Sequence, residues 1–337
     1  MAGRHRAVQP RAGWRRHIAV LATTGLLLGT GGFAEGAQSP AAYRAFSDGS
    51  WWNRALPRTA PTHPNSEALL TYLRSGSESS SCLTLAGAGT GQWGQPVYWA
   101  GQDDRTYRVR PTNYPLPPEL ARLRVPAQAA PAATSDAELV IFDRAKGYVV
   151  ALWHARYDAS ADRWSAGGAA VTYLRSNGLH VRTGRSNDPR NTGSWRGNNG
   201  ATMMVRYDEV AAGRIRHVLK FAAGPEVSTR HIFPLIASDG RATAAGAPPQ
   251  GLRLRIRPGV DLRAMGLSRQ ALVIARALKR YGMYLGDSGG TNSLKLEDTR
   301  ATGGGQLWRL GPRALCGLPL TSRYWSVLPE KYTPPAR

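Results

Sequence analysis

The chain has 337 residues, of which 42% are hydrophobic, and its formal net charge is +22. This length can bury a sizeable core as one large domain or as two smaller units. The basic residues are scattered, and the sequence has no clustered basic helix, zinc-finger spacing or aromatic RNA-binding motif, so a specific nucleic-acid partner is not expected. A strongly positive protein should instead concentrate at anionic surfaces.

The first 36 residues predict a secretory signal peptide. Five arginines and no acid precede an apolar run over residues 18–33, and small residues that suit cleavage follow it. The run is shorter than the roughly 20 residues that a membrane-spanning helix needs, and no other segment is long and apolar enough to span a membrane. We therefore expect a secreted protein that does not cross a membrane. The pair Arg15–Arg16 leaves both general secretion and twin-arginine export open.

Residues 37–64 form a Pro-rich, extended lead to the mature protein. Its Trp51 and Trp52 either pack the lead onto the domain or stack on a sugar ring. A short helix capped by Asn65 or Ser66 is expected to end near Arg74. Residues 92–110 are typical of two strands.

A three-strand meander is predicted over residues 137–142, 148–157 and 163–174, because close turn signals separate these apolar runs. The long loop at 182–200 is rich in Gly, Asn, Ser and Arg, and loops of this length are often functional or disordered. Alternation or composition then predicts a helical turn at 205–212 and strands at 214–221, 230–235, 252–257, 293–297, 306–310 and 323–328.

The clearest local pattern is a helix over residues 268–281. Ser268 is a good N-cap, apolar residues recur at three- and four-residue steps, and basic residues occupy the last turns, where the helix dipole favours them. Gly282 suits the end of the helix. A short apolar strand and the Gly-rich turn at 286–290 follow, so the helix delivers Asp287 and Ser288 to a turn.

Many short strands with few helices predict an all-β fold, an antiparallel β-sandwich or jelly roll with a few short helices packed on it. We expect one domain over residues 37–337, as a monomer. Cys82 and Cys316 are the only cysteines; in an oxidising compartment they form a disulfide, and the alternative is two buried free thiols. No adjacent histidine cluster accompanies them, so neither a metal nor another cofactor is expected.

The segment GDSGG at 286–290 resembles the nucleophile loop of trypsin-like serine proteases, which implies Ser288 as a nucleophile. The resemblance covers five residues. Neither Cys82 nor Cys316 follows a histidine, the Ile-Val-Gly-Gly amino end of that family is missing, and Thr291–Asn292 stand where Pro-Leu is usual. We therefore interpret the segment as a Gly-rich turn after a buried strand.

Six segments together resemble an uncharacterised family of secreted proteins that is common in actinobacteria. They are DGSWWN (48–53), SDAELVIFD (135–143), WSAGGAAV (164–171), VRYDEVAAGRIRHVLKF (205–221), RLRIRPGVDL (253–262) and ALKRYGMYLGD (277–287). The resemblance implies no defined activity, although the pattern is similar to that of jelly-roll enzymes acting on glycans. In that family the loop after the last strand is more constant at Asp than at Ser.

Glycan cleavage needs two carboxylates, or a base and a charge neutraliser for uronic acids. The candidate catalytic residues are Asp136, His217 and Asp287, provided that they share one cleft; a hydrogen-bonded core position is the other interpretation of His217. Candidate substrate-binding residues are Trp51, Trp52, Trp164, Lys279, Arg280 and Tyr281.

Three functions therefore remain open. The favoured one is a glycosidase or polysaccharide lyase acting on an anionic or neutral cell-wall or extracellular glycan. The second is a non-catalytic carbohydrate- or wall-binding protein, and the third is a serine hydrolase that uses Ser288.

Overall fold

The computed structural model describes residues 43–75, 81–89, 92–192 and 194–335. The chain divides into two units, Met1–Glu35 and Gly36–Arg337, and every described residue belongs to the second. The predicted signal peptide lies outside the described residues. None of the helices that are described has the length and hydrophobicity that a membrane crossing requires.

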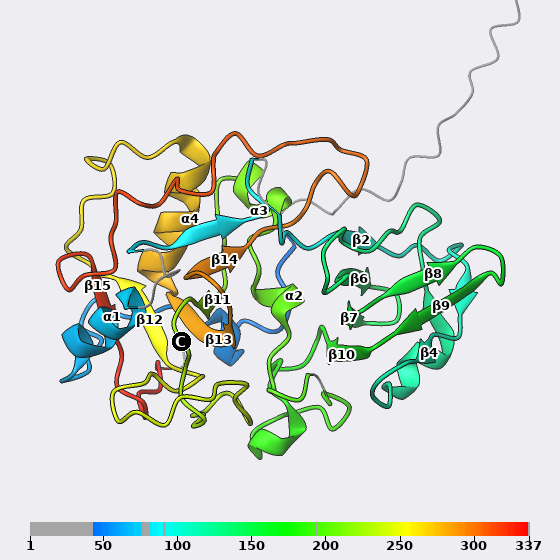
Figure 1. The fold of residues 1–337 in the computed structure, drawn as a ribbon, viewed down its shortest axis with the longest axis horizontal. Helices are drawn as coiled ribbons and strands as arrows, with labels where there is room; N and C mark the ends of the chain where they lie inside the picture. The colour runs from blue at the N-terminus through cyan, green and yellow to red at the C-terminus, as the bar shows by residue number, and fades with distance from the viewer. Residues whose placement is uncertain (1–42, 76–80, 90–91, 193, 336–337) are drawn as a thin grey trace, which may run out of the picture. The chain divides into compact units, whose positions relative to one another are not determined.

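A six-stranded mixed sheet occupies the side of this unit that also carries the longest described helix (Figure 1). Its order is β1 (Thr84–Ala86), β14 (Ser293–Lys295), β11 (Leu219–Ala223), β13 (Met283–Ser288), β12 (Arg253–Ile256) and β15 (Trp325–Val327). The pairs β1–β14 and β11–β13 are parallel, and the other neighbours are antiparallel.

Helix α4 (Arg269–Arg280) connects β12 to β13 and packs against β12, as the apolar spacing predicted. The Ser268 hydroxyl accepts a hydrogen bond from the Ala271 amide at 3.3 Å, which confirms the N-cap. Gly282 follows with φ of +74°, and a Cβ there would lie 2.3 Å from the Leu254 carbonyl oxygen. Glycine is therefore required both by the backbone conformation and by the close approach of β12.

A four-stranded sheet has the order β10 (Gly168–Tyr173), β7 (Tyr148–Trp153), β6 (Leu139–Asp143) and β2 (Val97–Trp99). The pairs β6–β7 and β7–β10 are antiparallel, which confirms the order of the predicted meander. The strands predicted at 148–157 and 163–174 are each broken, however, and only β7 and β10 of them belong to this sheet. Two smaller sheets pair β3 (Thr106–Tyr107) with β5 (Leu123–Arg124), and β4 (Arg110–Pro111) with β9 (Arg163–Ala166) and β8 (Arg156–Asp158). The remaining elements are η1 (Trp51–Asn53), α1 (Ser66–Arg74), η2 (Pro118–Arg122), η3 (Val181–Thr183), α2 (Gly200–Met203) and α3 (Tyr207–Ala211).

Cys82 and Cys316 form a disulfide with Cα atoms 5.0 Å apart, across 234 residues of sequence, so this pairing is confirmed. The fold is β-rich with few helices, as expected. The expectation of antiparallel sheets needs correction, because β2–β6 and β4–β9 are parallel as well as β1–β14 and β11–β13.

One predicted turn and three predicted strands are also corrected. The turn expected at 286–290 begins later, because β13 continues through Gly286 and Asp287 to Ser288. Residues 230–235 form only an isolated bridge at His231, and residues 306–310 form no strand. There, the Leu307 amide donates to the Thr299 hydroxyl and the Trp308 indole donates to the Glu297 carbonyl, so side chains replace strand pairing. The strand predicted at 214–221 begins only at Leu219, where pairing with β13 starts.

Candidate active site

A cavity of about 860 Å³ lies between the two large sheets. One wall comes from the residues just before β6 and from β7 and β10, and the other comes from β11, β13 and β14. The loop predicted at 182–200 contributes Arg182, Ser194, Trp195, Arg196 and Asn198 to the lining. The volume falls in the range of small-molecule and substrate sites.

Asp287 reaches this cavity because of an irregularity in the pairing of β11 with β13. Leu285 pairs with Phe221, but the next pair is Asp287 with Ala222, so Gly286 is an extra residue. The bulge places the Asp287 side chain on the face of the sheet that also carries Lys220. A Cβ at Gly286 would lie 2.7 Å from both Asn198 Nδ2 and Lys220 Cγ, so this position needs glycine for space.

Two cations hold the Asp287 carboxylate. Lys220 Nζ donates to Oδ2 at 2.8 Å, and the Arg196 guanidinium lies 2.8 Å from Oδ1. Burial alone would raise the pKa of Asp287, but the charges of Lys220 and Arg196 and the lysine hydrogen bond outweigh it and hold that pKa well below its usual range. Asp287 therefore stays ionised at any physiological pH and is unsuited to donating a proton.

Arg196 also pairs with Asp239, which accepts hydrogen bonds from Gln250 and, at 3.2 Å, from the Ser288 hydroxyl. No histidine among the described residues is hydrogen-bonded to Ser288. The hydroxyl therefore lacks the histidine base of the trypsin-like arrangement, and the carboxylate that it contacts, Asp239, is already paired with Arg196.

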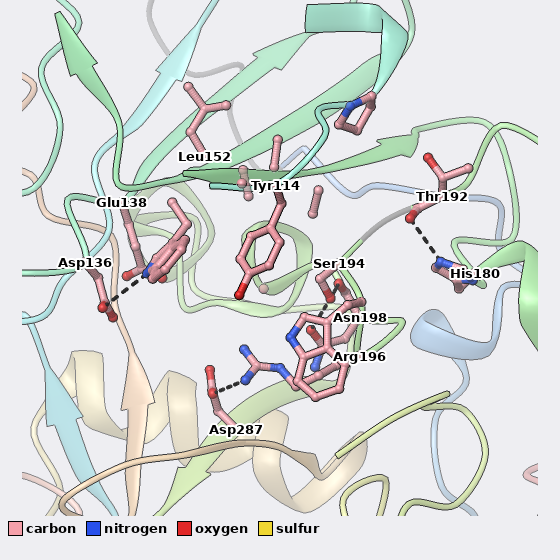
Figure 2. Close-up of a pocket in the computed structure, with 18 of the residues that line it drawn as sticks. Tyr114, Asp136, Glu138, Leu152, His180, Thr192, Ser194, Arg196, Asn198 and Asp287 are labelled. Carbon is pink, nitrogen blue, oxygen red and sulfur yellow. Dashed lines mark hydrogen bonds and ion pairs between the residues drawn. The ribbon is translucent and has the colours of Figure 1, made fainter. Parts of the chain in front are cut away.

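Asp136 and Glu138 lie on the opposite wall, where Figure 2 shows them across the cavity from Ser194 and Asn198. Glu138 is ion-paired with Lys295 and accepts a hydrogen bond from Gln95 Nε2 at 2.7 Å. The Asp136 carboxylate accepts one hydrogen bond from the described residues, from the Trp153 indole nitrogen at 3.3 Å. No ion pair formed between described residues involves Asp136.

The backbone beside these carboxylates is strained. Ala137, between Asp136 and Glu138, has φ of +41°, and His154, next to Trp153, has φ of +50°. The two residues face each other, since the His154 amide donates to the Asp136 carbonyl and the Ala155 amide donates to the Ala137 carbonyl. A left-handed residue with a side chain costs on the order of 1–2 kcal/mol, and such residues cluster at functional sites.

Aromatic rings complete the lining. Tyr114 and Trp195 are 62% and 59% exposed, which is unusual for side chains of their size. The Tyr114 ring lies between the two walls in Figure 2, and its centroid is 6.4 Å from that of Trp153. These rings therefore line the same cavity as the charged oxygens and nitrogens described above.

His180 also lines the cavity but is occupied by the backbone. Its Nδ1 accepts a hydrogen bond from the Arg182 amide and its Nε2 donates to the Thr192 carbonyl, both at 3.0 Å. This pattern defines the neutral ring, and burial lowers the pKa of His180 further. Its role is to fix the loop.

The structure brings Asp136 and Asp287 to one cavity, whereas His217 is not part of the lining. His217 is buried; its Nε2 lies 2.9 Å from Glu209 Oε2, and its Nδ1 lies 2.8 Å from the Val218 carbonyl oxygen. Glu209 in turn pairs with the buried Arg206. The structure thus places His217 in a hydrogen-bonded core position, away from the shared cleft that the catalytic assignment required.

The six predicted substrate-binding residues are likewise outside the cavity lining. Trp51, Trp52, Trp164 and Tyr281 are each no more than 8% exposed and belong to the hydrophobic cores. The Trp51 indole donates to the Tyr284 hydroxyl at 2.6 Å, and the Trp52 indole donates to the Gly178 carbonyl at 2.8 Å.

The two predicted cations have structural contacts as well. Lys279 donates to the Val260 carbonyl at 2.7 Å, and the Arg280 guanidinium lies over the Tyr281 ring. The burial of Trp51 and Trp52 shows that the described part of the lead, residues 43–64, packs onto the domain, which was the first interpretation of these tryptophans.

Sequence reasoning missed Glu138, Lys220, Arg196, Lys295 and Trp195. The available signals were the position of Glu138 two residues after Asp136, and the composition of the long loop that carries Arg196 and Trp195. Within the described residues, no group of three or more histidine, cysteine, aspartate or glutamate side chains is arranged to hold a metal ion. Comparisons with protein-family models, curated proteins and solved structures found no match for this chain.

Proposed function

We propose that the protein is a secreted glycoside hydrolase that cleaves an extracellular polysaccharide in the cavity between the two sheets. The observation that carries the proposal is that Asp136 and Asp287 line one cavity in different electrostatic environments. Pairs of carboxylates whose environments differ commonly divide the acid and charge-stabilising roles of glycoside cleavage.

In this mechanism Asp287, held ionised by Lys220 and Arg196, faces the positive charge that develops on the sugar ring. Asp136, which lies on the opposite wall and has no ion pair with a described residue, protonates the oxygen of the leaving sugar. The bond between the anomeric carbon and that oxygen breaks. The oxygen of water then bonds to the carbon, and the water passes one proton to the Asp136 carboxylate, which restores the acid. The exposed rings of Tyr114 and Trp195 support the sugar faces.

The charge pairing favours hydrolysis over elimination. A lyase needs a cation free to neutralise the substrate carboxylate, but Lys220 and Arg196 are paired with Asp287, and Lys295 is paired with Glu138. Of the cations in the described lining, only Arg182 carries no ion pair; it is exposed in the long loop and is the one neutraliser that a lyase could use.

Secretion and the sheet arrangement are part of the proposal. The basic and apolar segments of residues 1–36 and the Cys82–Cys316 disulfide both fit an oxidising, extracytoplasmic location. The two large sheets on either side of the cavity support a sandwich-like architecture, with the jelly-roll order as the more specific hypothesis.

The test is a panel of neutral and acidic polysaccharides incubated with the purified protein and read for new reducing ends and for unsaturated products. We expect reducing ends without unsaturation. Asp136→Asn should lower the rate by about 10²–10⁴, the usual contribution of a general acid. Asp103→Asn, at an exposed position outside the cavity lining, is the matched control and should keep the full rate. Unsaturated products would establish a lyase instead, and retention without cleavage would establish a binding protein.

A further inference from the structure

A second cavity, of about 560 Å³, lies at the edge of the six-stranded sheet that β12 and β15 form. It is bordered by the lead near Arg58, by β12 and the turn that follows it, and by β15. Figure 1 shows β12 and β15 on the side of this sheet away from β6, β7 and β10. Four arginines line the cavity, Arg58, Arg255, Arg257 and Arg323, against one acid, Asp261.

Arg255 carries a buried positive charge, with only 3% of the residue exposed. Its guanidinium donates to the Pro57 carbonyl at 2.7 Å and to the Lys279 carbonyl at 3.1 Å, and its Nε has no hydrogen-bond partner in the described structure. Burial and the neighbouring charge of Arg253 lower the pKa of Arg255. A buried charge without an opposite charge is costly, and carbonyl dipoles compensate it only in part.

The other three arginines are also without acidic partners. Among the described residues no ion pair involves Arg58, Arg257 or Arg323. Arg257 Nε donates to the Trp325 carbonyl at 3.2 Å, and the Arg323 guanidinium lies 5.3 Å from the centre of the Tyr324 ring. Asp261 is exposed, and its Oδ1 accepts the Arg263 amide at 2.9 Å.

We propose that this cavity is a binding site for a phosphate group. A guanidinium presents a planar fork of donors that matches phosphate oxygens in pairs, and several arginines around one anion are typical of phosphate recognition. A phosphate monoester presents three terminal oxygens in a tetrahedral arrangement, so guanidinium groups can approach it from several directions, whereas a carboxylate presents two oxygens in one plane. The ligand is either a free phosphate monoester or one unit of a phosphodiester polymer, and its binding would offset the charge of Arg255.

This inference is independent of the proposed hydrolase activity. The two cavities share no lining residue, and the second contains no pair of carboxylates. A phosphate site here would hold the protein on an anionic polymer while the first cavity remains accessible.

Calorimetric titration of the whole mature protein with inorganic phosphate, and separately with poly(glycerol phosphate), tests the proposal. The main variant replaces Arg58, Arg257 and Arg323 by glutamine, leaving Arg255 in place because it supports two carbonyls of the fold. The matched control replaces Arg108, Arg110 and Arg156 by glutamine; these exposed residues lie outside both cavities, so net charge falls by the same amount. We expect affinity to fall at least about tenfold in the main variant and less than about twofold in the control.

Melting temperatures check that the variants fold. A milder double variant, Arg58→Gln with Arg323→Gln at two exposed positions, replaces the main variant if Arg257→Gln is destabilising.

Binding of inorganic phosphate would identify the isolated group as sufficient, and binding of the polymer alone would identify the phosphodiester chain as the source. Equal losses of affinity in the main and control variants would show that only the net charge matters, and would refute the binding site. Tighter binding of polygalacturonate, with the same loss in the main variant, would overturn phosphate in favour of carboxylate. Cleavage in the polysaccharide panel should be unchanged in the main variant, so the outcome does not depend on that activity.

Discussion

The substitution Asp287→Asn tests whether the Asp287 carboxylate is catalytic or only structural. The substitution keeps the shape of the side chain but removes the charge that Lys220 and Arg196 both contact at 2.8 Å. Hydrogen bonds to charged groups contribute about 1.5–3 kcal/mol each, and the remaining amide oxygen still accepts one of them. Because these side chains are between 11% and 20% exposed, solvent screens part of the loss. We expect a destabilisation of about 1–3 kcal/mol, equivalent to a few degrees in melting temperature.

The stability loss should depend on pH with a defined sign. The pKa of Asp287 is lowered in the folded protein, so its contribution is full above the unfolded pKa of about 3.9 and is lost as the pH falls towards the folded value. Urea unfolding should therefore show a constant difference between wild type and variant above about pH 5, and a shrinking difference in stronger acid. The destabilisation alone leaves the variant folded at neutral pH, so activity can be measured.

Turnover of the substrate found in the panel should fall by about 10² or more in Asp287→Asn. Asp239→Asn is the matched control, because it removes the other carboxylate that pairs with Arg196 but lies outside the cavity lining. Ser288→Ala should also have little effect. Equal activity losses in the two aspartate variants would reduce Asp287 to a structural partner of Arg196. Activity that survives Asp287→Asn but not Ser288→Ala would refute the hydrolase mechanism and support a serine nucleophile.

Two further predictions concern stability. Burial raises the pKa of Glu297 to about 7; the charge of Asp208 adds to this effect, and the hydrogen bond from the Tyr207 amide opposes it. The free energy of unfolding should therefore fall by up to about 3 kcal/mol as the pH rises from about 4.5 through 7. Urea unfolding of Glu297→Gln should lack this decline, and parallel pH profiles of wild type and variant would contradict the prediction. Replacing Cys82 and Cys316 by serine should lower the free energy of unfolding by about 5 kcal/mol, because the bridge closes a loop of 234 residues in the unfolded chain. Full alkylation of both cysteines in native wild-type protein would show that the bridge is absent.

The elements that the sequence predicted well are those determined by nearby residues. Ser268 and Gly282 define the two ends of α4 through hydrogen bonding and backbone conformation, and short turns join the strands of the β6–β7–β10 meander. The parallel pairs β1–β14 and β11–β13 join segments far apart in the chain, and no local periodicity encodes which distant strand becomes a neighbour. Antiparallel sheets were therefore the natural expectation, and the mixed order emerged only from the structure.

The candidate site likewise contains residues that the local sequence predicts and residues that depend on contacts between distant segments. Asp136 and Asp287 were found because they stand at the ends of predicted strands, and they do line one cavity. His217 was chosen from an alternating pattern, which identifies an inward position but not its partner; the partner is Glu209, eight residues earlier on α3. Lys220 could not be assigned to Asp287 from sequence, because their contact depends on a bulge at Gly286.

The excess of positive charge has opposite consequences at the two cavities. In the first, Lys220, Arg196 and Lys295 are each paired with a carboxylate, so a substrate there need not be anionic to be held. In the second, the arginine cluster has no ion pair with a described residue, and the buried Arg255 relies on carbonyl oxygens alone. The proposed attraction to an anionic polymer and the proposed binding of a glycan substrate can therefore reside at separate places. A neutral glycan in the first cavity is as consistent with the charge of +22 as an acidic one.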